Sequence, residues 1–154
     1  MFLTARIVKN EKEERRCRNP LKSGQCFLHK PYELFKLAKK IYKKLDDDQE
    51  HFTVVFLDNN NQVTGYKVLF SGTMDSALVD IKILFRNALL FGAKAILIIH
   101  NHPSNNLEPS EKDLLITKKI KMASDILDIE LFDHLIIGDK YCHDYYSFAN
   151  EKLI

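Results

Sequence analysis

The sequence contains only three cysteines in 154 residues, namely Cys17, Cys26 and Cys142. None of them forms a C-x-x-C pair, and their odd number argues against the disulfide framework of a small secreted domain. We therefore expect reduced thiols in surface loops. A bridge or a second metal site that involves Cys17 and Cys26 stays open as a minor alternative.

Long apolar runs are also absent from the chain. No stretch approaches the roughly 20 apolar residues that span a bilayer, and residues 1–10 lack the apolar centre of a signal peptide. We therefore expect a cytoplasmic protein without membrane contact. The acidic run Asp46–Asp48 lacks the glycine and the closing glutamate of a calcium loop, which favours a linker there.

The net charge is only +2, but it is unevenly distributed. Residues 1–44 contain 13 Lys and Arg against four Glu, and the rest of the chain is acidic. Basic clusters make phosphate contacts, so a nucleic-acid or acidic partner stays open with weak support. The solvated face of an amphipathic helix is the more ordinary explanation for one group of lysines: Lys36, Lys39, Lys40, Lys43 and Lys44.

A chain of this length with 45% hydrophobic residues is long enough for one compact domain and too short for two. We expect a single domain over residues 1–154, with a basic, mobile N-terminal segment at residues 1–30 and an edge strand at Phe2–Val8. Apolar spacing of three and four predicts a helix from Pro31 to about Lys44.

The remaining pattern alternates strands with helices. Strand-like runs at Glu50–Leu57 and Gln62–Phe70 flank a turn and predict a hairpin. A loop and cap over Ser71–Ser76 would precede a helix from about Leu78 to Phe91, which Gly92 ends before a central strand. A further strand is expected at Leu131–Ile137, after a helix that starts at Ser110. These elements predict an α/β fold with a three-layer-like mixed β-sheet flanked by helices.

Potential metal ligands gather at the exit of the central strand, in the stretch AILIIHNHPSNNLEPSEKD from Ala95 to Asp113. Side chains two residues apart in a strand point the same way, so His100 and His102 converge. Ser110 has the N-cap residue type, and Asp113 stands in the first turn, where its carboxylate can face back toward the strand. Three such ligands with an open fourth position suit a catalytic zinc site.

A simpler interpretation of these residues also stays open at this point. Ser-x-x-Asp is a plain helix-capping arrangement, and two loop histidines can form local hydrogen bonds without any metal. Spacing alone does not choose between the two.

The order His100, one residue, His102, seven residues, Ser110, two residues, Asp113 resembles the JAMM (JAB/MPN) metalloprotease motif. The text HNHPSNNLEPSEKD, with FDHLIIGDKY and YYSFANEKL downstream, is similar to the RadC-like JAB domain family over most of the chain. The resemblance implies a JAB/MPN fold, which is related to that of cytidine deaminases. Two features depart from the family pattern: Asn105 stands where Gly is common, and a Pro-Arg-Glu helix start is missing near residues 80–83.

The resemblance also implies roles for individual residues. One Zn²⁺ would be held by His100, His102 and Asp113. Glu50 would be the general base that takes a proton from water, and the Ser110 hydroxyl would stabilise charge on the substrate carbonyl or cap the helix, or both. The implied activity is JAMM-type hydrolysis of a peptide or isopeptide bond in a protein substrate.

Other residues and functions compete with this assignment. Glu108 lies nearer to the ligands in sequence than Glu50 and could be the base instead. Without the resemblance, Glu50 would be interpreted only as a carboxylate at the start of a strand. His51 should point to the opposite face as a surface or locally bonded residue, and we expect a structural role for His134. Zinc deaminases need H-x-E and P-C-x-x-C, and neither string occurs. The alternative function is a DNA-repair-associated or partner-binding module in which the metal is structural.

Overall fold

A computed structural model describes residues 31–72 and 79–154 of the chain. The elements follow in the order α2 (Pro31–Tyr42), β1 (Glu50–Leu57), β2 (Val63–Gly72), α3 (Ile81–Leu90), β3 (Ala95–Asn101), α4 (Glu111–Leu127), β4 (Glu130–Ile137) and β5 (Tyr145–Ser147). The expected strand at Phe2–Val8, the N-terminal segment at residues 1–30 and two cysteines, Cys17 and Cys26, lie outside the described residues. Among the described helices, none has the length and apolar character needed to cross a membrane.

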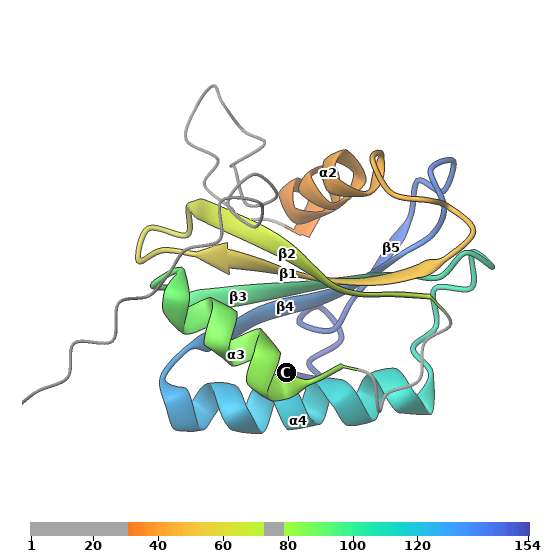
Figure 1. The fold of residues 1–154 in the computed structure, drawn as a ribbon. Helices are drawn as coiled ribbons and strands as arrows, with labels where there is room; N and C mark the ends of the chain where they lie inside the picture. Colours follow the sequence, from red (N-terminus) through yellow and green to blue (C-terminus); the bar gives the residue numbers. More distant parts are fainter. Residues whose placement is uncertain (1–30, 73–78) are drawn as a thin grey trace, which may run out of the picture.

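The strands form one mixed sheet in the order β2-β1-β3-β4-β5. β1 runs antiparallel to both β2 and β3, β3 and β4 are parallel, and β5 is antiparallel to β4. Helix α2 covers one face of the sheet, and α3 and α4 cover the other (Figure 1). The predicted α/β fold, a mixed sheet flanked by helices, is therefore confirmed.

The core has two parts, one on each face of the sheet. In β3 the even-numbered Ile96 and Ile98 pack on the side of α3 and α4, whereas Leu97 and Ile99 pack on the side of α2. All seven residues of β3 are buried. The same alternation places His100, the next even-numbered residue, on the face that α3 and α4 cover.

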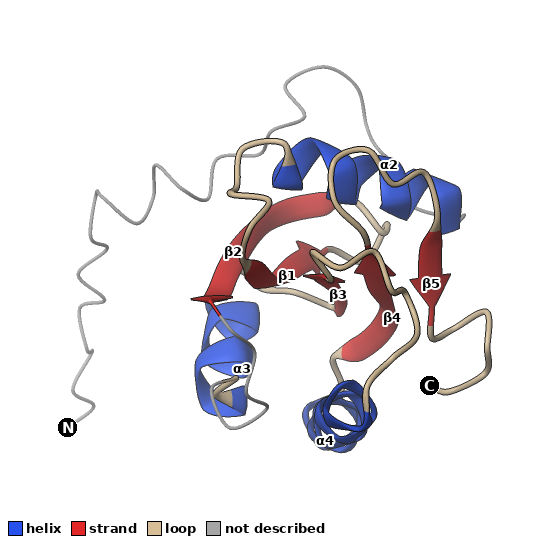
Figure 2. Ribbon diagram, turned by 90° about the vertical axis from the view of Figure 1, so that its right-hand side faces the viewer, coloured by secondary structure: helices blue, strands red, loops and turns tan. Residues whose placement is uncertain are grey.

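Helix α2 lies across the sheet face opposite to the other two helices (Figure 2). Its apolar side contributes Leu34, Phe35, Ala38 and Ile41 to the core, as the spacing predicts, and Leu37, which was not predicted, joins them. One lysine of this helix also makes specific contacts, because Lys39 Nζ donates hydrogen bonds to the carbonyl oxygens of residues 139 and 142, at 2.6 and 2.9 Å. This ammonium group therefore holds the loop that follows β4.

The predicted start of α3 was wrong by about one turn. The N-cap is Asp80, whose carboxylate accepts a hydrogen bond of 2.8 Å from Lys82 N. Ser71 and Gly72, which we assigned to a loop and cap, still belong to β2. The rest of that predicted loop and cap, residues 73–76, lies outside the described residues. Asp80 caps the helix because its carboxylate reaches a free N–H of the first turn. Gly92, with a left-handed φ of 60°, ends the helix as expected.

Candidate metal centre

The sheet register sets the position of Glu50 relative to the histidines. Phe52 on β1 is the direct partner of His100 on β3. Opposed residues of an antiparallel pair share a face, so the same register carried two residues further places Glu50 beside His102. The carboxylate of Glu50 accordingly acts on the pKa of His102 and raises it. Residues from two neighbouring strands therefore meet at this end of the sheet.

The structure brings the three expected ligands together. His100 Nδ1 lies 3.3 Å from Asp113 Oδ1, and His102 Nε2 lies 3.5 Å from Asp113 Oδ2. One possible ligand atom from each of the three residues lies within 4.8 Å of the others. Two histidines from the end of β3 and a carboxylate from the first turn of α4 thus form a compact triad.

Asp113 is held by the N-terminus of its own helix. Ser110 Oγ accepts a hydrogen bond of 3.2 Å from Asp113 N, and Asp113 Oδ2 accepts hydrogen bonds from Ser110 N at 2.7 Å and from Ser110 Oγ at 2.6 Å. This is a capping box, in which two free N–H groups of the helix start are satisfied reciprocally. The carboxylate that faces the two histidines is therefore also part of the helix cap. The hydroxyl hydrogen of Ser110 is already used in its hydrogen bond to Asp113 Oδ2.

The loop after β3 fixes the ring of His102. His102 Nδ1 lies 2.5 Å from the carbonyl oxygen of Asn106, which can only accept a hydrogen bond. Nδ1 therefore carries a hydrogen, and Nε2 is the nitrogen that faces Asp113. His102 N also donates a hydrogen bond of 2.8 Å to the carbonyl oxygen of Ile137 at the end of β4. Ring and backbone of His102 are thus both anchored.

Asn105 ties this loop to the segment after β4. Its φ is 60°, in the left-handed region that Asn tolerates better than most residues. Its side chain donates to Asp139 Oδ2 at 3.1 Å and accepts from Asp139 N at 2.8 Å. A Cβ at the neighbouring Gly138 would collide with Asn105 Oδ1. The two loops therefore pack as one unit.

The donor set fits a divalent metal ion. Within the described residues, His100 Nδ1, His100 Nε2 and Asp113 Oδ1 are buried and have no hydrogen-bond partner. Buried polar atoms are normally paired, because an unpaired one loses its solvation without compensation. A cation coordinated by two imidazoles and a carboxylate would satisfy such atoms, and this donor set is one that zinc accepts.

Protonation of the two histidines differs. Burial lowers the pKa of His100 to about 4, more than the nearby Asp113 charge raises it. His100 is therefore neutral at pH 7, in the form that binds metals. Burial also lowers the pKa of His102, but contacts with Asp113 and Asn106 and the charge of Glu50 outweigh it, so this pKa lies above its ordinary value.

Asp113 is ionised for a related reason. Burial raises the pKa of its carboxyl group, but the neighbouring His102 and His100 and the hydrogen bonds from Ser110 lower it further. The net result is a pKa well below the ordinary value for aspartate. The residue that would carry negative charge toward a metal is therefore charged at neutral pH.

His134 is a third histidine, beside the two of the triad, and its contact with the triad was not predicted. It is completely buried, and its ring lies 6.0 Å from that of His100 between centroids. Its Nδ1 lies 2.7 Å from Thr117 Oγ1, while its ring stacks on Phe148. Burial lowers its pKa to about 3. No local motif signals this arrangement, because its partner Thr117 lies on α4.

The two competing residues occupy different surroundings. His51 is buried rather than at the surface, with Nδ1 2.8 Å from Ser71 Oγ and Nε2 2.8 Å from the Asp46 carbonyl oxygen. Its expected local bonding is confirmed, and its surface placement was wrong. Glu108 is exposed in the loop, whereas Glu50 at the start of β1 is half-buried.

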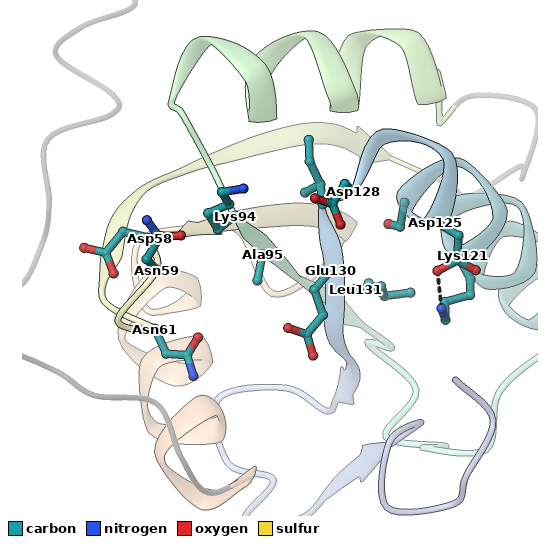
Figure 3. A pocket seen from close by; sticks show the side chains of 12 residues that line it. Asp58, Asn59, Asn61, Lys94, Ala95, Lys121, Asp125, Asp128, Glu130 and Leu131 are labelled. Carbon is teal, nitrogen blue, oxygen red and sulfur yellow. Dashed lines mark hydrogen bonds and ion pairs between the residues drawn. The ribbon is translucent and has the colours of Figure 1, made fainter.

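A cavity of about 460 Å³ lies at the opposite end of β3, lined by residues of α4, β4 and the β1–β2 turn (Figure 3). Its carboxylates include Asp58, Asp128 and Glu130, and its ammonium groups are Lys94 and Lys121. Over residues 31–72 and 79–154, the only group of three or more possible metal ligands within reach of one ion is the triad described above. The candidate metal centre is therefore at the carboxyl end of β3.

Comparisons with known proteins place the chain in one protein family. The RadC-like JAB domain matches residues 28–153. UPF0758 protein PM1152 of Pasteurella multocida is 35% identical over 144 residues, 94% of this chain and 62% of that protein. A UPF0758 protein of Actinobacillus pleuropneumoniae is 42% identical over 106 residues, 69% of this chain and 47% of that protein.

A UPF0758 protein of Flavobacterium johnsoniae is 44% identical over 104 residues, 68% of this chain and 44% of that protein. The chain spans about half the length of several of the curated relatives that it matches. The resemblance inferred from the motif is confirmed, and the chain belongs to the RadC-like JAB domain family.

Proposed function

We propose that this protein is a zinc-dependent hydrolase of the JAMM type, which cleaves a peptide or isopeptide bond in a protein substrate. The observation that carries the proposal is the triad of His100, His102 and Asp113, whose possible ligand atoms converge. Three buried atoms of the triad, His100 Nδ1, His100 Nε2 and Asp113 Oδ1, have no hydrogen-bond partner among residues 31–72 and 79–154. Family membership adds support, because the order of these residues is that of the JAMM motif.

Zinc held by the triad would supply a Lewis acid that lowers the pKa of a water to about 7 and polarises a carbonyl oxygen. The residues of the chain do the rest. His100 and Asp113 provide a neutral imidazole and an ionised carboxylate without any change of protonation at pH 7. Glu50, beside His102, takes the proton of the attacking water and later delivers one to the leaving amine.

Access to the site is through His102. Its side chain keeps 12% of its surface exposed, whereas those of His100 and Asp113 keep 1% each. A substrate carbonyl therefore approaches from the side of the loop that follows β3, next to Glu50. The buried ligands lie behind, where water is excluded and electrostatic stabilisation is stronger.

The first experiment is elemental analysis of protein purified without chelator, together with the His100→Ala variant. We expect one zinc per parent chain and none in His100→Ala. Hydrolysis is then followed with fluorogenic peptide and Nε-acyl-lysine libraries, with zinc alone as the blank.

Glu50→Gln separates base catalysis from metal binding. The variant should keep its zinc and lose at least about 100-fold in kcat/KM, since general bases contribute roughly 10²- to 10⁴-fold. Glu108→Gln is the matched control and should keep both properties. Equal hydrolysis by Glu50→Gln and the parent would remove Glu50 from the mechanism, and zinc binding without hydrolysis of any library would favour a binding module.

A further inference from the structure

His134 and His100 are neighbouring buried rings with unsatisfied nitrogens. The ring centroids lie 6.0 Å apart with the planes inclined by 33°. In the part of the chain that the structure describes, His134 Nε2 and both ring nitrogens of His100 have no hydrogen-bond partner. Three unpaired nitrogens in one buried place are unusual, because such atoms are costly unless something completes them.

The hydrogen bonds of Thr117 decide which nitrogen of His134 carries a hydrogen. Thr117 Oγ1 donates its single hydrogen to the Asp113 carbonyl oxygen, 2.5 Å away, because a carbonyl can only accept. The same hydroxyl lies 2.7 Å from His134 Nδ1, so it must accept from Nδ1–H. The neutral ring of His134 therefore has a bare Nε2, which is an acceptor.

A histidine that binds a metal through one nitrogen carries a hydrogen on the other and usually donates it to a nearby acceptor. We propose that His134 is a positioning residue, whose Nε2 accepts the hydrogen bond of the metal-free nitrogen of His100 when the triad is loaded. The contact is direct after a small ring rotation or passes through one water. This inference rests on the proposed zinc site, since it assigns the partner of a ligand.

A continuous series of contacts links two of the proposed ligands, Asp113 and His100. Asp113 contributes its carboxylate to the metal site and its carbonyl to Thr117, Thr117 holds His134, and His134 faces His100. Through His134 on β4, these contacts fix the position of the first turn of α4 relative to the end of β3. Phe148 stacks on His134 at 4.5 Å between ring centroids, which restricts rotation of the His134 ring.

The test measures zinc affinity by chelator competition in variants of two residues. His134→Phe keeps a ring against Phe148 but removes both nitrogens, and it should bind zinc about 10- to 100-fold more weakly, as loss of such partners does in other metal sites. Thr117→Val frees the tautomer of His134 and should weaken binding by a smaller factor. The unfolding free energy of each metal-free variant is measured alongside.

Phe56→Leu is the matched control for lost packing. Phe56 stacks on Phe91 at 4.5 Å and 13°, the same geometry as His134 on Phe148, and it lies in the core cluster on the face of the sheet that α3 and α4 cover. It should destabilise the fold and leave zinc affinity unchanged. ¹⁵N NMR of the parent provides a second readout: metal-free His134 should show Nδ1–H with bare Nε2, and zinc should shift the Nε2 signal upfield.

The outcomes separate this inference from the proposed function. Unchanged zinc affinity in His134→Phe, with zinc bound normally by the parent, overturns the positioning role alone. If His134→Phe does not fold, an Nε2–H tautomer in the parent, or an Nε2 signal that zinc leaves in place, has the same effect. A parent protein that binds no zinc overturns the proposed function and this inference together.

Discussion

Ser110 and Asp113 are hydrogen-bonded in both directions: Ser110 Oγ donates to the carboxylate oxygen Asp113 Oδ2 at 2.6 Å, and the backbone N–H of Asp113 donates to Ser110 Oγ at 3.2 Å. The carboxylate that faces the two histidines is therefore oriented by the residue that starts α4. From the sequence, both roles of Ser110 were compatible: its oxygen lone pair could cap the helix while its hydroxyl hydrogen stabilised charge on the substrate. The structure assigns that hydrogen to Asp113 before any substrate is present.

Replacement of Ser110 separates capping from catalysis. Ser110→Ala should lower the unfolding free energy by about 1 kcal/mol, whereas Ser110→Gly should cost only a few tenths, because Gly is an acceptable N-cap. If the hydroxyl also stabilises the substrate oxygen, both variants should lose about 100-fold in kcat. Urea unfolding and kinetics of the two variants give the comparison, and full activity in Ser110→Gly would leave Ser110 with the cap alone.

Replacement of Asn105 tests the left-handed backbone at the loop. Asn105→Gly and Asn105→Ala both lose the two hydrogen bonds to Asp139, but only Ala incurs a steric penalty at a φ of 60°. Asn105→Ala should therefore be less stable than Asn105→Gly by about 1–2 kcal/mol. The difference in urea midpoints measures it, and equal stability would show that the loop changes its conformation.

Zinc removal should loosen the site without unfolding the protein. The ligands sit at the end of buried β3 and on α4, and apolar residues of both elements pack into the core. The far-UV circular dichroism spectrum should survive chelation, while free zinc at roughly 1,000 times its Kd should add about 4 kcal/mol to the unfolding free energy. His102→Ala serves as the control and should show far less of this gain. Loss of the spectrum on chelation would mean that the metal forms the fold.

Acid should destabilise the chelated protein through its buried histidines. Burial lowers the pKa of His134 to about 3 and that of His100 to about 4, from an ordinary value of 6.5. As the pH falls below 6.5, the unfolded chain binds protons that the folded chain does not. The stabilising contribution of these neutral histidines is therefore fully present above pH 6.5 and is lost progressively as the pH falls toward 4.

The slope of stability against pH measures the effect, by urea titration in chelator between about pH 4.5 and 8. At pH values below 6.5, the slope of the unfolding free energy against pH reports how many more protons the unfolded chain binds than the folded chain. In His134→Phe this difference should be smaller by about one proton. His102 acts in the opposite sense, because its pKa is raised, and its contribution is lost as the pH rises through that raised pKa. A flat acid limb in the parent would contradict the burial of neutral histidines.

The parts predicted correctly from sequence depend on short-range patterns. The central strand was predicted from the short apolar run at residues 95–99, and the structure extends it to Asn101. The N-cap at Ser110 follows from capping chemistry over a few residues. The convergence of His100 and Asp113 follows in turn, because a strand end and a helix start joined by a short turn lie close together. Glu50 required family resemblance, since only the pairing of Phe52 with His100 places it there.

The features that sequence reasoning missed depend on distant partners. His134 bonds to Thr117 across 17 residues and two elements, and no periodicity connects them. For His51 the sequence left open a surface position or local bonding; the local bonding is confirmed, but the burial of the ring, which depends on the pairing of β1 with Ser71 of β2, was not predicted. The start of α3 was misplaced because several residue types before it can cap a helix, and only the fold selects Asp80.

The fastening of Asn105 to Asp139 has a practical meaning for protein engineering. His102 also donates to the Ile137 carbonyl, and Gly138 leaves no room for a side chain beside Asn105. The connections at residues 103–109 and 138–144 are therefore complementary surfaces. A chimera that takes only one of these two connections from a relative would lose the contacts that hold His102 against the segment after β4. Grafts must therefore transfer both connections together.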